Sequence, residues 1–191
     1  MIARLSKRIA SFFVCNRIIQ EEDKEVYEYG LQLLLSTVLN GLISLFLAII
    51  SGTFINCIFY LIAFVVIRKS AGGFHAETHW GCCCILAVVL SVFIALTKLV
   101  PHNFYTIISI FSVVFSLAAI IALAPLEHPN KPLSDIDRRR LRKVSLIYTA
   151  IICVLVVAFK LINYESIMVS IALGLLTASS SLIVAKMTGN C

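Results

Sequence analysis

The longest uncharged stretch of the sequence covers the 39 residues between Glu28 and Arg68. An α-helix rises about 1.5 Å per residue, so roughly 20 residues cross the ~30 Å hydrocarbon core of a bilayer. The stretch is therefore long enough to cross a membrane twice. Because the small residues Ser51-Gly52-Thr53 near its middle favour a turn, we predict that the chain reverses direction there.

The rest of the sequence has the same apolar character. Of its 191 residues, 60% are hydrophobic and only 14% are charged, which excludes a soluble domain because so few polar side chains could not cover its surface. We expect an all-α, polytopic integral membrane protein that forms a single membrane domain over residues 1–191. The second and third spans are short, so a re-entrant or interfacial segment there is an alternative. Six transmembrane helices are predicted, near residues 31–50, 54–67, 80–97, 99–126, 144–159 and 166–185.

Lysine and arginine residues predict the orientation, because cytoplasmic loops keep positive charge near the ends of membrane spans. If both termini are cytoplasmic, all of the 16 Lys and Arg residues except Lys98 and Lys160 lie on the cytoplasmic side. We therefore predict a multi-pass protein of the plasma membrane with both termini in the cytoplasm. The net charge of +6 then reflects membrane topology and requires no nucleic-acid partner.

The pattern of apolar and basic residues within residues 1–28 predicts an amphipathic helix that lies in the inner membrane interface. Apolar Ile2, Leu5 and Ile9 recur at steps of three and four, while basic and polar residues occupy the other side. The acidic cluster Glu21-Glu22-Asp23 indicates the start of a second helix, because acidic side chains in a first turn complement the helix dipole. We expect that helix to lead directly into the first span.

Reactive side chains concentrate in residues 68–84, which we predict to be a cytoplasmic catalytic segment. It contains two of the four histidines, three of the seven cysteines and the pair Gly72-Gly73. Glycine lets the backbone bend sharply or approach another group closely. A histidine beside a cysteine can withdraw the thiol proton, and the thiolate that results is the reactive nucleophile. The segment therefore predicts a cysteine acyl-transfer site.

The spacing leaves two candidates for the base. His75 lies seven residues before Cys82, which on a regular helix separates them by about 10.5 Å along the axis. Proton transfer requires about 2.6 to 3.2 Å. A His75–Cys82 pair therefore needs a break in the helix, which we predict near Gly81 or at residues 78–80. His79 is the alternative base, because it lies only three residues before Cys82.

The cysteines themselves allow other interpretations. Cys83 follows His79 by four residues and has the same chemistry as Cys82, so it is an alternative nucleophile. Juxtamembrane cysteines are also palmitoylation sites or inert apolar residues. Finally, His75, His79 and a cysteine could bind Zn²⁺ in a noncatalytic membrane scaffold.

A transporter or exporter component is a further alternative. Such proteins place ionisable or helix-breaking residues near the middle of the membrane. Here that pattern is limited to Asn40 and Gly41 in the first span and Gly174 in the sixth. It does not account for the clustering of glycine, histidine and cysteine in residues 68–84.

This combination of residues resembles the AgrB family, the accessory gene regulator B membrane endopeptidases that process autoinducing-peptide precursors. Length, number of spans and the basic N-terminal helix fit as well, so the resemblance covers nearly the whole chain. The motifs that carry it are Arg68 before Ala71-Gly72-Gly73-Phe74-His75-Ala76, a cysteine seven residues after that histidine, and Ala124-Pro125-Leu126-Glu127-His128-Pro129-Asn130-Lys131-Pro132-Leu133 before a basic helix.

The resemblance implies roles for these residues. His75 and Cys82 match the catalytic pair of the family, and neither a metal nor another cofactor is expected. The second motif lies in a second cytoplasmic loop, residues 125–143. We assign substrate binding to residues of both segments, namely Arg68, Gly72, Gly73, Asn130 and Lys131.

The resemblance also implies the substrate and the reaction. The partner is a short precursor peptide with an amphipathic leader, which binds at the lipid bilayer and reaches an active site on the cytoplasmic face. Cleavage on the C-terminal side of the signal sequence passes through a thioester acyl-enzyme. An internal cysteine or serine of the precursor then closes a thiolactone or lactone ring. A homodimer is expected from the resemblance alone.

Overall fold

The computed structural model describes residues 2–73, 79–126 and 134–188. Within these ranges the chain forms α-helices and short 3₁₀ helices but no strand. The predicted all-α fold is confirmed for this part of the chain. In chain order, the elements are α1 (Ile2–Cys15), η1 (Glu21–Asp23), α2 (Lys24–Ser51), α3 (Phe54–Ala71), α4 (His79–Leu99), η2 (His102–Phe104), α5 (Tyr105–Leu123), α6 (Asp135–Leu161) and α7 (Glu165–Met187).

Six helices in the described ranges are long and apolar enough to cross a membrane, as the sequence predicts. They are α2, α3, α4, α5, α6 and α7. The chain reverses where turn residues are expected, since Gly52 and Asn163 adopt left-handed backbone angles with φ of 67° and 60°. The fourth span is shorter than predicted. A 3₁₀ turn after Pro101 and the extended backbone at Ala124 confine α5 to Tyr105–Leu123.

α1 is also shorter than the helix expected within residues 1–28. It ends at Cys15, and Arg17 adopts a left-handed conformation with φ of 58°. Glu21–Asp23 then form the 3₁₀ turn η1, which continues into α2, so the acidic cluster does begin a new helix. The location of α1 in the membrane interface stays a prediction.

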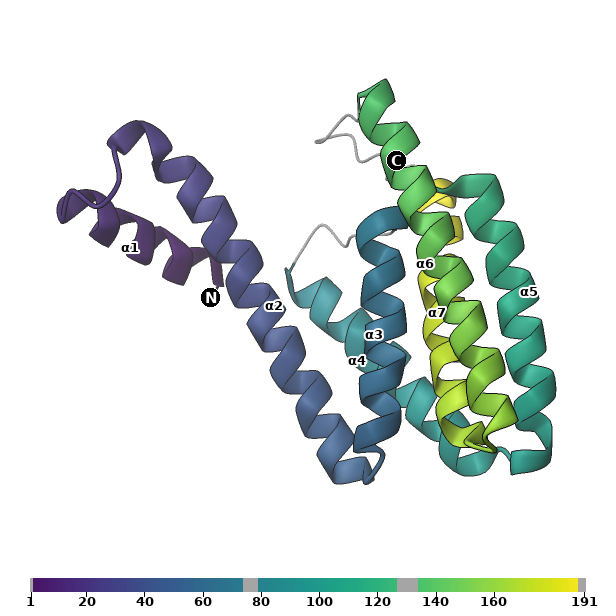
Figure 1. Cartoon of the computed structure of the whole chain (residues 1–191). Helices are drawn as coiled ribbons and strands as arrows, with labels where there is room; N and C mark the ends of the chain where they lie inside the picture. The colour runs from purple at the N-terminus through teal and green to yellow at the C-terminus, as the bar shows by residue number, and fades with distance from the viewer. Residues whose placement is uncertain (1, 74–78, 127–133, 189–191) are drawn as a thin grey trace. The chain divides into compact units, whose positions relative to one another are not determined.

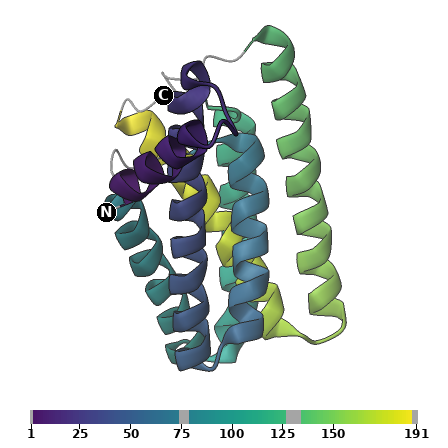
Figure 2. The same ribbon diagram turned by 90° about the vertical axis from the view of Figure 1, so that its left-hand side faces the viewer.

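The chain separates into two compact units, each described here by itself. The first contains Met1–Leu47 and Ala76–Val88, and the second contains Ala48–His75 and Val89–Cys191. In the first unit, the N-terminal end of α4 lies beside the middle of α2 (Figure 2). The second unit contains α3, α5, α6, α7 and the C-terminal half of α4.

α7 is the central helix of the second unit. It packs against α3, α5 and α6, which lie around it (Figure 1). In the membrane-spanning part of α7, 61% of the residues are buried, compared with 17% for α2. Gly174 allows the closest approach, because a Cβ at this position would clash with the backbone oxygen of Tyr60 on α3. Small residues of this kind let membrane helices pack through backbone contacts.

Hydrogen bonds between side chains also connect α7 to its neighbouring helices. Tyr60 Oη donates to Thr177 Oγ1 over 3.0 Å, which connects α3 to α7. The hydroxyl groups of Ser116 on α5 and Ser179 on α7 lie 2.9 Å apart. Each such bond stabilises a membrane protein by about 0.6 kcal/mol on average. Together with the close contact at Gly174, they fix how α7 sits among its neighbours.

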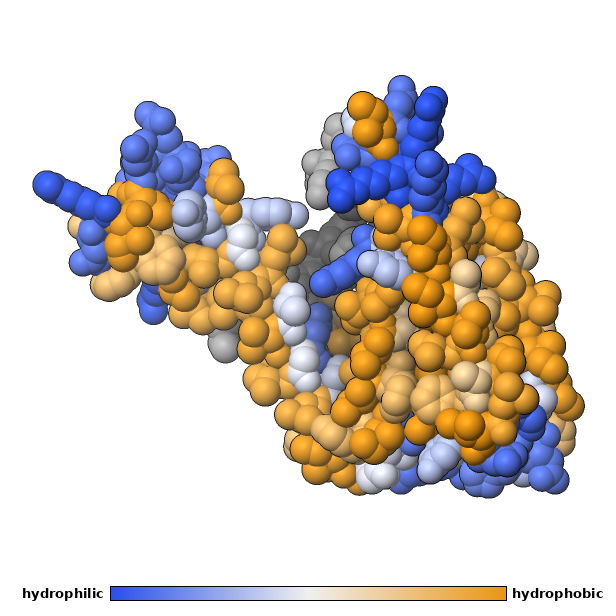
Figure 3. Space-filling model, viewed as in Figure 1, coloured by the Kyte–Doolittle hydropathy of each residue, from blue (hydrophilic) through white to orange (hydrophobic). Residues whose placement is uncertain are grey.

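The outer surface of the second unit is apolar. Figure 3 shows a continuous hydrophobic band over α5 and α6, with hydrophilic residues at both ends of these helices. Large apolar side chains in this band are mostly exposed, for example Ile107, Phe111 and Val154 at 64%, 63% and 66%. A soluble protein rarely exposes so large an apolar patch. The band fits the hydrocarbon core of a bilayer.

We predict that Gly174→Ala and Gly41→Ala change stability in opposite directions. The added methyl group at Gly174 meets Tyr60 and Ala63, and such overpacking costs about 1 to 3 kcal/mol. A Cβ at Gly41 meets nothing within 4 Å, so alanine gains up to about 1 kcal/mol of helix propensity there. Thermal unfolding in detergent measures both variants. Equal effects of the two substitutions would contradict the central position of α7.

Candidate functional site

The predicted nucleophile lies at the start of a helix. α4 begins at His79, which places Cys82 in its first turn. The backbone N–H groups of a first helical turn produce a positive potential that favours negative charge nearby, including a thiolate. Cys82 therefore lies at the positive end of the helix dipole.

The predicted break near Gly81 is wrong. α4 runs from His79 through Gly81 to Leu99 without interruption. A glycine costs a helix about 1 kcal/mol relative to alanine. This cost is too small to interrupt a helix whose following residues are apolar enough to cross a membrane. Before His75, the backbone leaves the helical region at Gly72 and Gly73, where φ is 84° and 148°. Residue 78, part of the second predicted position of the break, lies outside the described residues.

The three consecutive cysteines are not equivalent. Successive residues of a helix point about 100° apart, so their thiols face three directions. Cys82 is partly exposed, Cys83 is buried with only 3% of its surface exposed, and Cys84 is exposed. A buried thiol in apolar surroundings is a poor nucleophile because its charged form is poorly solvated. Accessibility therefore favours Cys82 over the alternative Cys83.

Cys82 contacts a polar side chain of α2. Nδ2 of Asn40 donates to Sγ of Cys82 over 3.9 Å. Asn40 lies 12 residues after Glu28, which is about 18 Å along the helix axis, within the long uncharged stretch. Its Oδ1 is buried and has no hydrogen-bond partner among the described residues. Such an unpaired atom costs about 1 to 3 kcal/mol, so it calls for an explanation.

The two candidate bases precede Cys82 in the chain. His75 lies outside the described residues. His79 is the first residue of α4, three positions before Cys82, and its side chain lies outside the described part. Both stay candidates for the base.

The second unit brings the starts of the two sequence motifs together. The N–H group of Leu126 donates to the carbonyl oxygen of Ala71 over 3.0 Å, so the chain after α5 is bonded to the end of α3. Gly72 lies against the same residue, since a Cβ there would be 2.8 Å from the oxygen of Leu126. We call Ala71, Gly72, Gly73 and Leu126 the glycine corner. Its close backbone contact explains why glycine occupies position 72.

Arg68 and Ser181 adjoin the glycine corner. A Cβ on Gly73 would be 2.6 Å from Oγ of Ser181 on α7 and 3.3 Å from Nη1 of Arg68. The Arg68 guanidinium lies over the ring of Phe64, 5.5 Å from its centre. Three of the predicted substrate-binding residues, Arg68, Gly72 and Gly73, are therefore neighbours. The other two, Asn130 and Lys131, lie outside the described residues.

Sequence reasoning missed two residues of these sites. It noted Asn40 only as weak support for a transporter, and it did not consider Ser181. Asn40 had one usable signal, because an amide in the middle of an apolar span is costly unless it has a role. Ser181 belongs to the run Ser179-Ser180-Ser181, in which three small polar residues give no indication of which one approaches Gly73.

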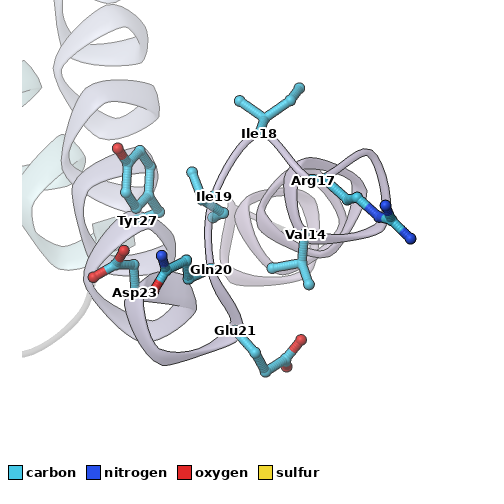
Figure 4. A pocket seen from close by; sticks show the side chains of 8 residues that line it. All are labelled: Val14, Arg17, Ile18, Ile19, Gln20, Glu21, Asp23 and Tyr27. Carbon is cyan, nitrogen blue, oxygen red and sulfur yellow. The ribbon is translucent and has the colours of Figure 1, made fainter.

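A cavity of about 650 Å³ lies between the end of α1 and the start of α2. Figure 4 shows Val14 and Arg17 on one side and Asp23 and Tyr27 on the other. The cavity contains none of the predicted site residues. Its complete lining is Val14, Arg17, Ile18, Ile19, Gln20, Glu21, Asp23 and Tyr27.

The zinc alternative is not supported by the described ranges. Among the side chains that the structure describes, no three His, Cys, Asp or Glu residues come together in a way that could hold a metal ion. The side chains of His75 and His79, which the zinc alternative requires, lie outside this part of the structure. The alternative therefore stays open only for a site that includes these histidines.

Comparison with known proteins places the chain among relatives along most of its length. The family model described as "Accessory gene regulator B" matches residues 6–183. A "Putative AgrB-like protein" of Clostridium perfringens (strain SM101 / Type A) is 26% identical over 190 residues, covering 91% of this chain and 87% of the relative. A "Putative AgrB-like protein 2" of Clostridium perfringens (strain 13 / Type A) is 26% identical over 155 residues, covering 76% and 71%. No solved structure matches significantly.

We predict that Gly72→Ala destabilises the protein more than Gly52→Ala. Both glycines have positive φ, 84° and 67°, so alanine adds backbone strain of about 1 to 3 kcal/mol at either position. Only at Gly72 does the methyl group also meet a backbone oxygen, that of Leu126. The difference in unfolding temperature between the two variants measures this contact. Equal losses of unfolding temperature in the two variants would mean that the close approach between residue 72 and Leu126 does not require glycine.

Proposed function

This chain belongs to the accessory gene regulator B family, and we propose that it is a membrane cysteine endopeptidase that matures an autoinducing-peptide precursor. Family membership supports a role in the processing of such peptides. The chemistry that we assign is thioester formation on Cys82 followed by cyclisation of the peptide. We place the site on the cytoplasmic face of the plasma membrane.

One observation carries the chemical part of the proposal: Cys82 is an accessible thiol in the first turn of α4, in contact with an amide donor. The helix N-terminus and Nδ2 of Asn40 both lie where they can interact favourably with negative charge that develops during the reaction. The same contact weakens the transporter alternative, since Asn40 was the main polar residue that supported it. Here its amide faces a nucleophile rather than a solute path.

The first half of the reaction forms the acyl-enzyme. A base, His75 in our proposal, takes the proton of Cys82, and Sγ attacks a carbonyl carbon of the precursor. The carbonyl π electrons move to oxygen and give a tetrahedral intermediate. When the carbonyl re-forms, the C–N bond breaks and the departing amine takes the proton held by the base. The C-terminal fragment leaves, and a thioester to Cys82 remains.

The second half transfers the acyl group within the precursor. A cysteine or serine of the bound signal sequence loses its proton to the base and attacks the thioester carbonyl. The bond to Sγ breaks, Cys82 recovers its proton, and a thiolactone or lactone results. A nucleophile held in place reaches effective concentrations of about 10⁵ M or more, so ring closure competes with hydrolysis. The apolar surroundings of α2 and α4 reduce the access of water further.

Substrate recognition is assigned to charged and small residues. The Arg68 guanidinium adjoins the glycine corner, beside Gly73. Arginine is suited to pair with carboxylates, so we propose that it binds an acidic side chain of the precursor. Asn130 and Lys131, in the loop that follows Leu126, complete this assignment. The amphipathic leader of the precursor lies in the interface beside α1, which raises its local concentration.

We predict that a mass increase appears on the wild-type protein when it is incubated in liposomes with its precursor peptide. Intact-mass spectrometry detects the acyl adduct, and hydroxylamine removes it because the adduct is a thioester. Cys82→Ala abolishes the adduct and the cleavage. Cys84→Ala, which removes the exposed neighbouring thiol, retains both. An adduct that persists in Cys82→Ala but is lost in Cys83→Ala would assign the nucleophile to Cys83.

The base is identified by the same assay. We expect His75→Ala to lower the rate of adduct formation by about 100- to 10,000-fold, the usual contribution of a general base. His79→Ala should leave it within a few-fold of wild type. The reverse result would make His79 the base, which its position on the same helix as Cys82 allows.

A further inference from the structure

Asn40 is the side chain that contacts the proposed nucleophile. Its Nδ2 donates to Sγ of Cys82, whereas its Oδ1 is buried without a partner in the described part of the chain. An asparagine with a purely structural role in an apolar helix is expected to have both ends of its amide paired, because unpaired polar atoms are costly away from water. Among the described residues, only one end of this amide is paired, and its partner is a thiol.

From this geometry we propose that Asn40 is a further catalytic residue, whose Nδ2–H group stabilises the negative charge on Cys82 and then on the tetrahedral intermediate. The inference rests on the proposed function, in which Cys82 attacks a peptide carbonyl. It adds an electrostatic role for a residue of α2, a helix outside both sequence motifs.

The negative charge moves only a short way during the attack. Before the reaction it is on Sγ of Cys82. When Sγ bonds to the carbonyl carbon, the π electron pair moves to the carbonyl oxygen, which is then two bonds from Sγ. A donor that already contacts Sγ can therefore reach this oxygen with a small rotation of its side chain. The charge returns into the re-formed carbonyl bond as the amine leaves.

The position of Asn40 increases the effect of this donor. It lies on α2, within the 39 uncharged residues that follow Glu28. Electrostatic interactions are stronger where water and other charges are scarce, and a donor that is already in place needs no reorganisation. One N–H group at this position therefore matters more than it would at an exposed site.

The unpaired Oδ1 offers a second contact to the same substrate. A peptide backbone presents an N–H donor next to each carbonyl acceptor. Bound with its carbonyl at Nδ2, an extended peptide can present a neighbouring N–H group to Oδ1. The two ends of the Asn40 amide thus match a peptide backbone, and binding satisfies the atom that is unpaired without substrate.

The first test needs no substrate. With the other cysteines replaced, the rate of alkylation of Cys82 by iodoacetamide is measured against pH, with intact mass as the readout. Asn40→Ala removes the donor, so the alkylation profile shifts to higher pH. Ser44→Ala is the matched control, because it removes a buried hydroxyl one helical turn away on α2 and leaves the amide in place. Its profile is expected to match that of wild type.

The second test uses the precursor peptide in single-turnover experiments. Removal of one oxyanion donor costs about 100- to 1,000-fold in rate, and we expect this loss for acylation of Cys82 in Asn40→Ala. Asn40→Gln keeps the carboxamide and recovers part of the rate. If Asn40→Ala does not fold, Asn40→Leu is used in both tests, because an apolar side chain of similar size suits a membrane helix.

The outcomes separate this inference from the proposed function. An unchanged alkylation profile together with an acylation rate within about twofold of wild type in Asn40→Ala or Asn40→Leu would overturn the role of Asn40. Loss of rate with equal loss in Ser44→Ala would also overturn it, since the effect would then be structural. Absence of an adduct on Cys82 in the wild-type protein contradicts the proposed function instead, and the alkylation profile still decides whether Asn40 stabilises the thiolate.

Discussion

The structure depends on the requirement that backbone polar groups be hydrogen-bonded within the chain wherever lipid replaces water. This requirement keeps the uncharged stretches helical and confines irregular backbone to short connections such as Gly52 and Asn163. It also makes unpaired polar atoms expensive inside the protein. The polar side chains that remain in the spans are therefore informative. Some are paired between helices, as at Ser116 and Ser179, and Asn40 is paired with Cys82 at one end only within the described residues.

The glycine corner and the surroundings of Cys82, each within its own unit, use different physical devices. In the glycine corner, the absence of a side chain lets the backbone at Gly72 approach Leu126, which connects the motif after α3 with the segment after α5. At Cys82, a helix N-terminus and an amide donor lie next to a partly exposed thiol. In our proposal, the first device positions backbone and Arg68 for recognition, and the second holds the nucleophile. Our proposed function needs both.

Much of the fold could be predicted, because charge and apolar runs determine where a chain can cross a membrane. The spans and the reversal at Gly52 follow from the sequence alone, and the acidic cluster at 21–23 correctly indicates a helix start. The continuity of α4 through Gly81 could not be predicted, since a single glycine is compatible with both a helix and a turn. The Asn40–Cys82 contact joins residues 42 positions apart, and only tertiary packing decides such a contact.

The central claim is that Cys82 lies against Asn40 in the middle of α2. Disulfide formation tests it directly, with Cys82 as the only native cysteine and either Asn40→Cys or Leu42→Cys introduced on α2. The account predicts rapid oxidation to an internal disulfide in Asn40→Cys, detected as a loss of two hydrogens by intact mass. Leu42, whose side chain is 58% exposed, should give little product. Equal cross-linking by both variants, or cross-linking by Leu42→Cys alone, would contradict the account.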